Sequence, residues 1–353
     1  MKDGEVFGTT QAGEAVRRFT IRGGGLTANI IGLGAIVQDL RLTGHDAPLV
    51  LGYDRFEPYE TDRAYFGAVV GRFANRIRDG RFTIAGNRYQ TERNFLGKHT
   101  LHGGSEGYFH RPWTVSLHGR DFVTLTLHDP DGTMGFPGAL DVTCTYRLKI
   151  PGTLSMELTA TCEEPTLCNL AQHSYFNLDD GGAGDILDHR LMLNAGAYTP
   201  VDGEMIPTGA VKPVDGTPYD FRQARPLRME TEGEQLPYDV NFCLASSRGP
   251  LHQAAWVQGA NSGARWKSGR RSPVCSSISA NMSRRRRRGW MTGATNRSPA
   301  FALKRRPGPT RRTGPISPKR RCGLDKSIIR LRNTGSGSPD LAVETSSKRL
   351  ERC

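Results

Sequence analysis

Residues 140–162 read LDVTCTYRLKIPGTLSMELTATC, and this stretch decides the fold class. Apolar side chains alternate with polar ones on both sides of Pro151 and Gly152. The alternating apolar residues are Leu140, Val142, Cys144, Tyr146, Leu148, Ile150, Leu154, Met156, Leu158, Ala160 and Cys162. A period of two residues is typical of a strand with one buried face. Proline and glycine between two such strands favour a tight turn, so the stretch predicts an antiparallel hairpin.

The same pattern recurs in shorter form at residues 123–132 (VTLTLHDPDG) and 80–90 (GRFTIAGNRYQ), each ending or turning on Asp, Asn and Gly. No stretch carries a 3.6-residue apolar period over three turns. Short strands separated by turn residues are typical of a sandwich or barrel rather than an α/β protein. The sequence therefore predicts an all-β fold, a large antiparallel β-sandwich.

The charge divides the chain into two unlike segments. Residues 1–265 carry 25 basic and 31 acidic side chains, a net charge of −6, whereas residues 266–353 carry 23 basic and 4 acidic ones, a net charge of +19; together they give the overall +13. The second segment includes five consecutive arginines at 284–288 and is rich in Ser, Pro and Gly. This composition predicts a mostly disordered basic tail.

Composition also excludes several classes of protein. The first residues include acids and no apolar run, so they predict neither a secretory signal nor a membrane span, and we expect a cytoplasmic protein. The seven cysteines are scattered without a Cys-x-x-Cys pair, which favours reduced thiols over a disulfide framework or a zinc site.

Three short motifs could carry chemistry, although each alone is more often structural. GRFANRI (71–77) sets Asn75 beside Arg76, LHGG (101–104) sets His102 before two glycines, and HSYFNL (173–178) contains a histidine able to exchange a proton near neutral pH. The glycines of LHGG would let the backbone come close to a ligand. His99 and His102 lack a third ligand, so no metal site is predicted, and no nucleotide-binding fingerprint is present.

Together and in this order, these motifs and YDVNFCL (238–244) resemble the aldose 1-epimerases, also called galactose mutarotases, from about residue 5 to residue 265. The resemblance implies a large antiparallel β-sandwich. It also implies an isomerase that interconverts the α and β anomers of free aldoses such as galactose and glucose. This chemistry needs no metal or organic cofactor, and the expected partner is a monosaccharide.

The resemblance further implies roles for individual residues. His173 would be the general acid, and His102 would hydrogen-bond the sugar near the reacting carbon. Residues that would hold sugar hydroxyls are Asn75, Arg76, Tyr175 and Asp239. Asp239 is followed by Val240, whereas the family usually has an Asp-His-Asn-Phe run.

The general base of the family is a glutamate near the C-terminus, in a string like GFCLETQ, and this chain has no such string. After Arg265 its only acids are Asp325, Asp340, Glu344 and Glu351. A one-base shift of the reading frame would explain the loss. With permitted synonymous codons, residues 265–278 then read MEVWTTEPGVQFY and residues 301–315 read CLETQAWPDAPNRP, in which the glutamate arises across Leu303 and Lys304. We interpret residues 266–353 as an out-of-frame tail on a sandwich that spans residues 1–265.

Three alternatives remain. A sugar-binding sandwich without turnover would keep the hydroxyl contacts and lack the base. A hexose-6-phosphate epimerase would need a phosphate-binding arginine cluster, which the sequence does not reveal. A nucleic-acid arm would bind in a salt-dependent way, but the arginines at 284–288 lack interleaved aromatic residues.

Overall fold

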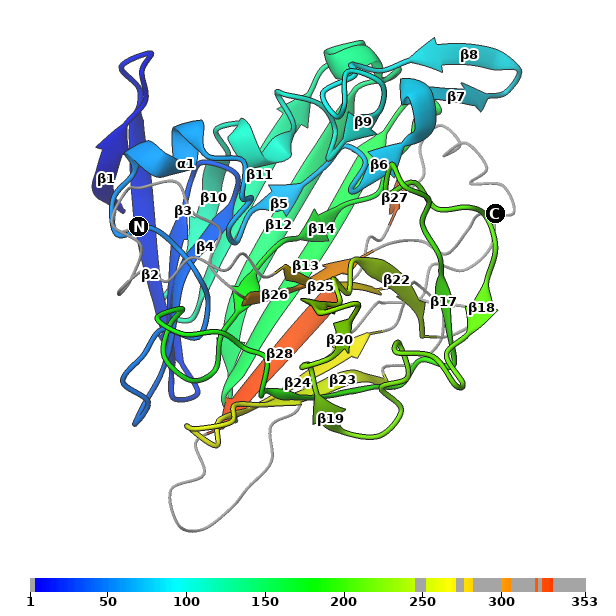
Figure 1. The fold of residues 1–353 in the computed structure, drawn as a ribbon. Coiled ribbons are helices and arrows are strands. Elements are labelled where there is room, and N and C mark those ends of the chain that lie inside the picture. The colour runs from blue at the N-terminus through cyan, green and yellow to red at the C-terminus, as the bar shows by residue number, and fades with distance from the viewer. Residues whose placement is uncertain are drawn as a thin grey trace.

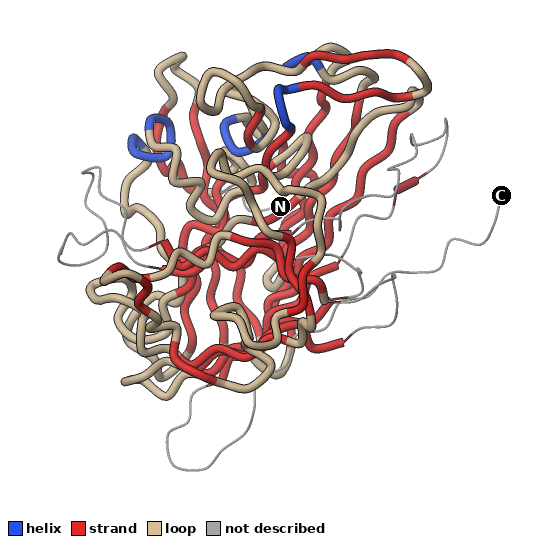
Figure 2. Tube along the Cα trace, turned by 45° about the vertical axis from the view of Figure 1, so that its right-hand side comes forward, coloured by secondary structure: helices blue, strands red, loops and turns tan. Residues whose placement is uncertain are grey.

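The computed structural model describes residues 4–244, 252–270, 276–281, 300–305, 321–322 and 326–332. Three sheets dominate it, of four, ten and six strands (Figure 1). The helices of the described residues are short: α1 (Glu57–Thr61) and single 3-10 turns at Arg78–Gly80, Tyr108–His110 and Thr133–Gly135. Figure 2 shows strands and loops throughout, which confirms the all-β prediction. None of the helices in the described ranges has the length and apolar character needed to cross a membrane.

The largest sheet forms the long diagonal layer of Figure 1. In spatial order its strands are β10 (Thr114–His118), β11 (Phe122–Asp129), β12 (Leu140–Lys149), β13 (Thr153–Cys162), β28 (Lys326–Arg332), β24 (Arg265–Arg270), β23 (His252–Gln258), β16 (Arg190–Leu193) and β19 (Arg225–Pro226), with β27 (Arg321–Cys322) also paired to β13. Within the described residues, all neighbouring strands of this sheet pair antiparallel.

The other two large sheets lie against this layer (Figure 1). The four-stranded sheet is an N-terminal meander of β1 (Glu5–Thr9), β2 (Ala15–Gly23), β3 (Leu26–Ile31) and β4 (Ile36–Leu42). The six-stranded sheet runs in the order β15 (Tyr175–Phe176), β26 (Ala300–Arg305), β25 (Ser276–Asn281), β22 (Val240–Cys243), β17 (Ala197–Thr199) and β18 (Lys212–Pro213). Two-stranded pairs complete the fold: β14 (Ala171–Gln172) with β5 (Val69–Val70), β6 (Arg76–Ile77) with β9 (Thr100–Leu101), β7 (Arg81–Ile84) with β8 (Asn87–Gln90), and β20 (Glu230–Thr231) with β21 (Glu234–Gln235).

The hairpin predicted from residues 140–162 is confirmed as β12 and β13, in continuous register from Leu140 opposite Cys162 to Lys149 opposite Thr153. The alternating apolar side chains of both strands are buried. Ile150 is the exception, because the strand ends at Lys149 and Ile150 lies in the turn with 85% of its surface exposed. The alternation therefore predicted the buried face correctly but placed the end of the strand one residue too late.

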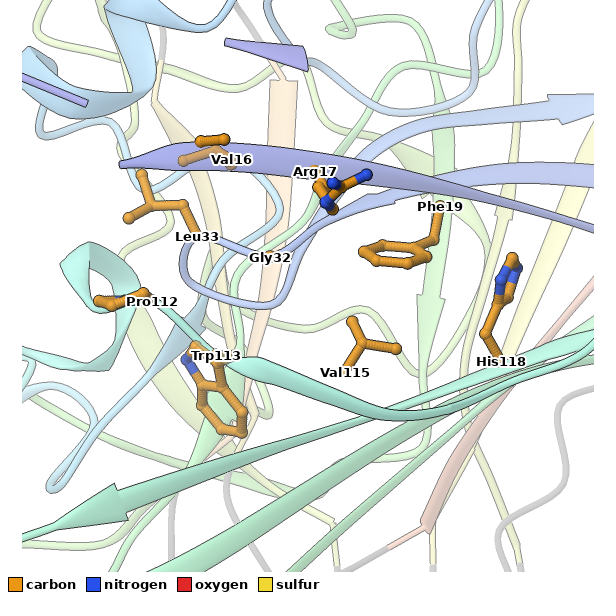
Figure 3. A pocket seen from close by; sticks show the side chains of 10 residues that line it. Val16, Arg17, Phe19, Gly32, Leu33, Pro112, Trp113, Val115 and His118 are labelled. Atoms are coloured by element: carbon orange, nitrogen blue, oxygen red, sulfur yellow. The ribbon is translucent and has the colours of Figure 1, made fainter. Parts of the chain in front are cut away.

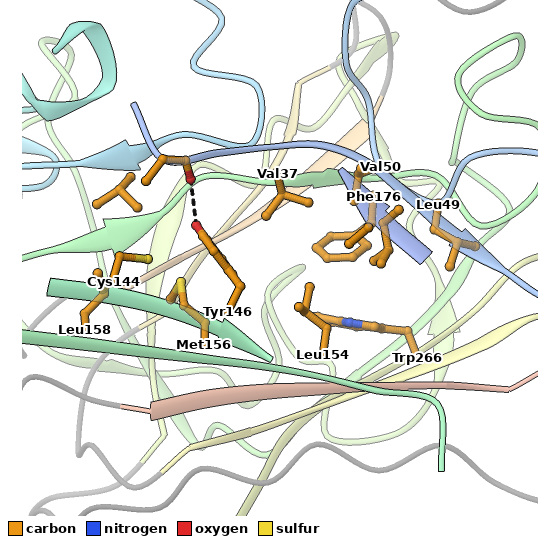
Figure 4. Close-up of a cluster of buried hydrophobic side chains, with 14 of the residues drawn as sticks. Val37, Leu49, Val50, Cys144, Tyr146, Leu154, Met156, Leu158, Phe176 and Trp266 are labelled. Atoms are coloured by element: carbon orange, nitrogen blue, oxygen red, sulfur yellow. Dashed lines mark hydrogen bonds between the residues drawn. The ribbon is translucent and has the colours of Figure 1, made fainter. Parts of the chain in front are cut away.

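The main hydrophobic core lies between the layers (Figure 4). The Tyr146 hydroxyl on β12 donates a hydrogen bond to the Ala35 carbonyl over 2.9 Å, which ties the large sheet to the loop before β4. Trp266 on β24 is fully buried, and its ring lies 5.0 Å from that of Phe176 on β15. Because these two rings belong to different large sheets, they join the sheets across the core.

Short segments of the tail pair with strands of the preceding residues in the described structure. Within residues 266–353 the described residues are most of β24 and all of β25, β26, β27 and β28. The other residues of the tail, to which the prediction of disorder mainly applies, lie outside the described ranges. The physical reason for these strands is backbone pairing: β28 fills the space between β13 and β24, and β26 pairs with β15. Strand edges offer unpaired N–H and C=O groups to any extended chain, whatever its side chains.

Candidate active site

His173 and Tyr175 are positioned by the two short strands β14 and β15. The backbone of His173, which lies between them, donates to the Ala68 carbonyl over 2.8 Å and accepts from the Gly67 amide over 3.2 Å. The His173 side chain is fully buried, whereas Tyr175 is half-buried, and their rings lie 4.9 Å apart. HSYFNL therefore presents two polar rings on one well-anchored turn.

Asn75 and His102 hold each other in place beside the β6–β9 pair. The Asn75 amide donates to Nδ1 of His102 over 2.9 Å, and the His102 amide donates to the Asn75 carbonyl over 2.9 Å. Because Nδ1 accepts a hydrogen bond, Nε2 carries the hydrogen in the neutral ring. Both residues adopt left-handed backbone, with φ of 70° and 53°. Such conformations cluster at functional sites, where the surrounding structure maintains them.

The glycines of LHGG have a structural role at one position. Gly103 has a φ of 91°, and a Cβ there would lie 1.9 Å from the Gly71 carbonyl oxygen. Gly103 thus makes a close approach to the backbone of GRFANRI, while the predicted approach of the LHGG backbone to a ligand stays a prediction. This contact sets LHGG against GRFANRI.

The imidazole rings of His102 and His173 meet nearly at right angles. Their centroids are 5.3 Å apart and their planes are inclined at 87°. The sequence separation of these residues is 71 positions, so no local pattern could have shown the contact. The pair joins the two halves of the predicted site.

Arg76 and Asp239 complete the site from two further elements. Arg76 begins β6, donates to the Asn75 side-chain oxygen over 3.1 Å, and lies 4.5 Å from the Phe95 ring centroid. Burial lowers the pKa of Arg76, and attraction by the Asp239 carboxylate opposes this shift. Asp239 directly precedes β22 and is half-buried. All six predicted site residues thus come from segments that meet in one place, while their roles stay predictions.

Tyr65 was missed by the sequence reasoning. Its ring lies 4.7 Å from that of His102, 5.6 Å from that of His173 and 4.7 Å from that of Phe109. It stands on the loop before β5 with a φ of 60°. A tyrosine in an irregular segment is not part of any periodic pattern in the sequence. Only its ring contacts in the folded structure place it in the site.

A buried charge network supports the start of GRFANRI. Arg72 has 1% of its side chain exposed and forms an ion pair of 2.5 Å with Asp129. Arg111 and the Tyr108 hydroxyl also contact Asp129, over 2.5 and 2.7 Å. Two cations and one hydroxyl satisfy this carboxylate, as a buried charge requires. The network anchors the motif beneath Asn75 and Arg76.

His99 and His102 each use Nδ1 to accept a backbone hydrogen bond. His99 accepts from the Asp79 amide over 2.9 Å, and its Nε2 lies 3.2 Å from a Glu204 carboxylate oxygen. Within the part of the chain that the structure describes, no group of three or more His, Cys, Asp or Glu could hold a metal ion. These histidines are hydrogen-bonding residues in the described structure.

A cavity of about 320 Å³ lies elsewhere, between β2 and β10 (Figure 3). Its walls are mainly apolar and include Phe19, Leu33, Trp113 and Val115. A sugar needs several polar partners, so this cavity does not suit one. The polar groups that suit a sugar gather instead around His102, His173 and Arg76.

The strand beside Tyr175 comes from the tail. In the register of β15 and β26, Tyr175 is opposite Ala302 and Phe176 is opposite Phe301. Because the strands are antiparallel, continuing this register carries residues 303 and 304 toward Ser174 and His173. Leu303 and Lys304 are the positions across which the shifted reading frame would encode glutamate.

Comparison with known proteins gives one consistent family. The profile described as Aldose 1-epimerase matches residues 17–273. Galactose mutarotase from Rattus norvegicus is 40% identical over 250 residues, which cover 69% of this chain and 72% of that protein. Aldose 1-epimerase from Haemophilus influenzae is 42% identical over 195 residues, which cover 54% of this chain and 57% of that protein.

Solved structures agree with this match. The GalM/aldose epimerase homologue from C. elegans superposes with a TM-score of 0.80 at 26% identity, covering 91% of this chain and 100% of that one. Galactose 1-epimerase from Lactobacillus acidophilus superposes with a TM-score of 0.75 at 22% identity, covering 94% of this chain and 98% of that one, a likeness that speaks to the fold alone.

Proposed function

The chain belongs to the aldose 1-epimerase family of isomerases, which bind monosaccharides, and from that premise we propose that its site binds a free aldose such as galactose or glucose in the ring form. The observation that carries the proposal is the contact of the His102 and His173 imidazoles, 5.3 Å apart, with Arg76 and Asn75 beside them. Two polar rings and a half-buried guanidinium suit a ligand with many hydroxyl groups and no net charge.

The reaction is the interconversion of anomers. An acid protonates the ring oxygen while a base takes the proton of the C1 hydroxyl, so the bond from C1 to the ring oxygen breaks and an aldehyde forms. Rotation about C1–C2 and the reverse proton transfers close the ring on the other face of C1. His173 serves as the acid, since imidazole exchanges protons near neutral pH. His102 donates its Nε2 hydrogen to the sugar near C1.

The remaining groups hold the sugar against these histidines. Arg76 offers several fixed donors, Asp239 accepts from hydroxyls, and Asn75 and Tyr175 add a side-chain amide and a phenol. Two features support this assignment. The pKa of Arg76 responds to the carboxylate of Asp239, and the Asn75 side chain accepts from Arg76 over 3.1 Å. The cluster would therefore orient hydroxyls on more than one side of the ring.

We propose that this chain has lost the general base. The strand expected to carry it is β26, because residues 303 and 304 lie two positions or fewer past Ala302, which pairs with Tyr175. In the shifted frame this strand would read Cys-Leu-Glu-Thr-Gln.

A second candidate function is sugar binding without turnover. The observation that favours it is that Leu303 and Lys304 stand where the shifted frame encodes the glutamate, and neither is a carboxylate. Losing a positioned proton-transfer group typically lowers a rate by roughly 10²–10⁴-fold. The hydroxyl contacts of residues 75, 76, 102, 175 and 239 do not depend on that group.

Two measurements on the full chain test the proposal. Calorimetric titration with galactose should give saturable binding that weakens in a His102→Gln variant, whereas His128→Gln, which changes a histidine that is largely exposed, should bind as the parent does. Polarimetry of freshly dissolved α-galactose then separates the two candidates: turnover identifies the enzyme, and binding without acceleration identifies the sugar-binding domain. Absence of saturable binding by the parent chain would contradict both.

A further inference from the structure

Tyr65 occupies the corner between the two histidines of the proposed site. Its ring centroid is 4.7 Å from that of His102, with the planes inclined at 70°, and 5.6 Å from that of His173, with the planes inclined at 47°. The histidines themselves are 5.3 Å apart. The three rings therefore form a closed triangle in which each ring touches the other two.

The space behind Tyr65 is almost closed. Phe109 meets the Tyr65 ring edge to face, at 4.7 Å and 87°. A void bordered by Tyr65, Phe109 and Tyr59 holds about 10 Å³, which is at most about the volume that one water needs. This void is too small to accept the Tyr65 ring.

The backbone of Tyr65 is held in a conformation that tyrosine disfavours. Its φ is 60°, a region populated mainly by glycine, asparagine and aspartate. Keeping a tyrosine there costs free energy, and residues kept under such strain cluster at active sites. His102 and Asn75, its neighbours in the site, share this property.

The charge around Tyr65 comes from arginines. The positive charges of Arg63 and Arg76 lower the pKa of the Tyr65 hydroxyl, but burial raises this pKa by more, so the net shift is upward. The phenol is therefore neutral at neutral pH. A neutral ring can lie against two imidazoles in either protonation state without introducing a negative charge.

We infer that Tyr65 is a positioning residue that fixes the orientations of the His102 and His173 imidazoles toward the sugar. The inference deepens the proposed function and rests on it. Ring contacts of this kind stabilise a pair by a modest amount each, but proton transfer depends on orientation, so a small tilt of either imidazole is costly. The hydroxyl is not needed for this role, and the aromatic ring is.

Two substitutions of Tyr65 distinguish the role of its aromatic ring from any effect on folding. Tyr65→Phe keeps the ring and removes the hydroxyl. Tyr65→Asn removes the ring and suits the left-handed backbone better than tyrosine does, so it adds no backbone strain. Tyr89→Asn is the matched control, because Tyr89 on β8 stacks on Phe82 at 5.4 Å and lies outside the site. Should Tyr65→Asn lower the thermal midpoint by more than the control does, Tyr65→Gly serves as the second ring-free variant.

The first readout is galactose affinity by calorimetry of the full chain. We expect Tyr65→Phe and Tyr89→Asn to bind within about twofold of the parent, and Tyr65→Asn to bind about tenfold more weakly, as the loss of two ring contacts implies. Unchanged affinity in Tyr65→Asn, or an equal loss in Tyr65→Phe, would overturn the inference.

The second readout does not require sugar. In protein labelled with ¹³C-histidine, the His102 and His173 imidazole signals, assigned with glutamine variants, should each be single in the parent and in Tyr65→Phe, and should broaden or double in Tyr65→Asn. The His189 signal should stay unchanged in all three proteins. Single, sharp signals for both site histidines in Tyr65→Asn would overturn the inference. If the parent binds no galactose, the proposed function fails while these signals still decide the role of Tyr65.

Discussion

Asn75 and His102 exchange two hydrogen bonds of 2.9 Å, one from the Asn75 amide to the His102 ring and one from the His102 amide to the Asn75 carbonyl. The exchange fixes the ring through Nδ1, which accepts the bond, so that Nε2 carries the hydrogen in the neutral ring. Both residues sustain a positive φ to make it. Two residues that lie 27 positions apart in sequence thereby hold their motifs together.

A glycine at position 75 tests the role of the Asn75 side chain while keeping the backbone conformation. We predict that Asn75→Gly lowers galactose affinity about tenfold, since it removes roughly one hydrogen bond between the side-chain amide and a sugar hydroxyl. Glycine accepts a φ of 70° without strain, so the free energy of unfolding should change by no more than about 1 kcal/mol. Calorimetry and urea denaturation measure the two quantities.

Asp79→Gly is the control for this prediction. Asp79 also has a positive φ, of 54°, but its amide bonds to His99 rather than to a site residue. Its replacement should leave galactose affinity unchanged. If Asn75→Gly binds galactose as well as Asp79→Gly does, the Asn75 side chain has no part in binding.

Replacing Trp266 tests whether the start of the tail is part of the hydrophobic core. It is fully buried against Phe176, so Trp266→Ala should lower the free energy of unfolding by about 3–5 kcal/mol. Trp256 on β23 is half-buried and offers a control, whose replacement by alanine should cost less. Denaturant titration of both variants gives the comparison. Equal losses of unfolding free energy in the two variants would mean that Trp266 is not packed in the core at its position on β24.

His189 should make the fold sensitive to mild acid. Burial lowers its pKa below the ordinary 6.5, although Asp179 and the neighbouring acids oppose the shift, and its Nε2 accepts a bond from the Leu178 amide over 3.0 Å. Because the unfolded chain then binds a proton that the folded chain resists, stability is full above pH 6.5 and falls as the pH drops below it. The slope is at most about 1.4 kcal/mol per pH unit for one proton.

A His189→Gln variant isolates this effect. Glutamine can still accept from Leu178 and does not titrate, so its free energy of unfolding should fall less steeply below pH 6.5 than that of the parent. His45 and His110, whose pKa values burial also lowers, are present in both proteins and cancel in the comparison. Parallel pH profiles for the two proteins would contradict the assignment.

The sequence was most informative where a side-chain period reports burial. The alternation in residues 140–162 predicted β12 and β13, because one face of each strand is packed against the core. It did not predict β25, β26 and β28, since these strands pair through the backbone at edges that the rest of the fold supplies. Pairing of this kind leaves no period in the sequence.

The site was predictable only in part, for a similar reason. Motifs resembling one family named His102, His173, Asn75 and Arg76, yet the contact between the two imidazoles depends on pairing between distant segments. Tyr65 was missed because it lies in an irregular loop. The residues of such loops are fixed by tertiary contacts and not by local preference.

Polarimetric mutarotation of α-galactose tests most directly our proposal that this chain keeps the sugar-binding site and the acid but lacks the base. The chain should be compared with a protein whose gene is returned to the shifted frame after Arg265, and with the same protein carrying glutamine in place of the recovered glutamate. We predict that the restored protein is faster than both others by roughly 10²–10⁴-fold. If the present chain equilibrates the anomers as fast as the restored protein does, the central claim is wrong.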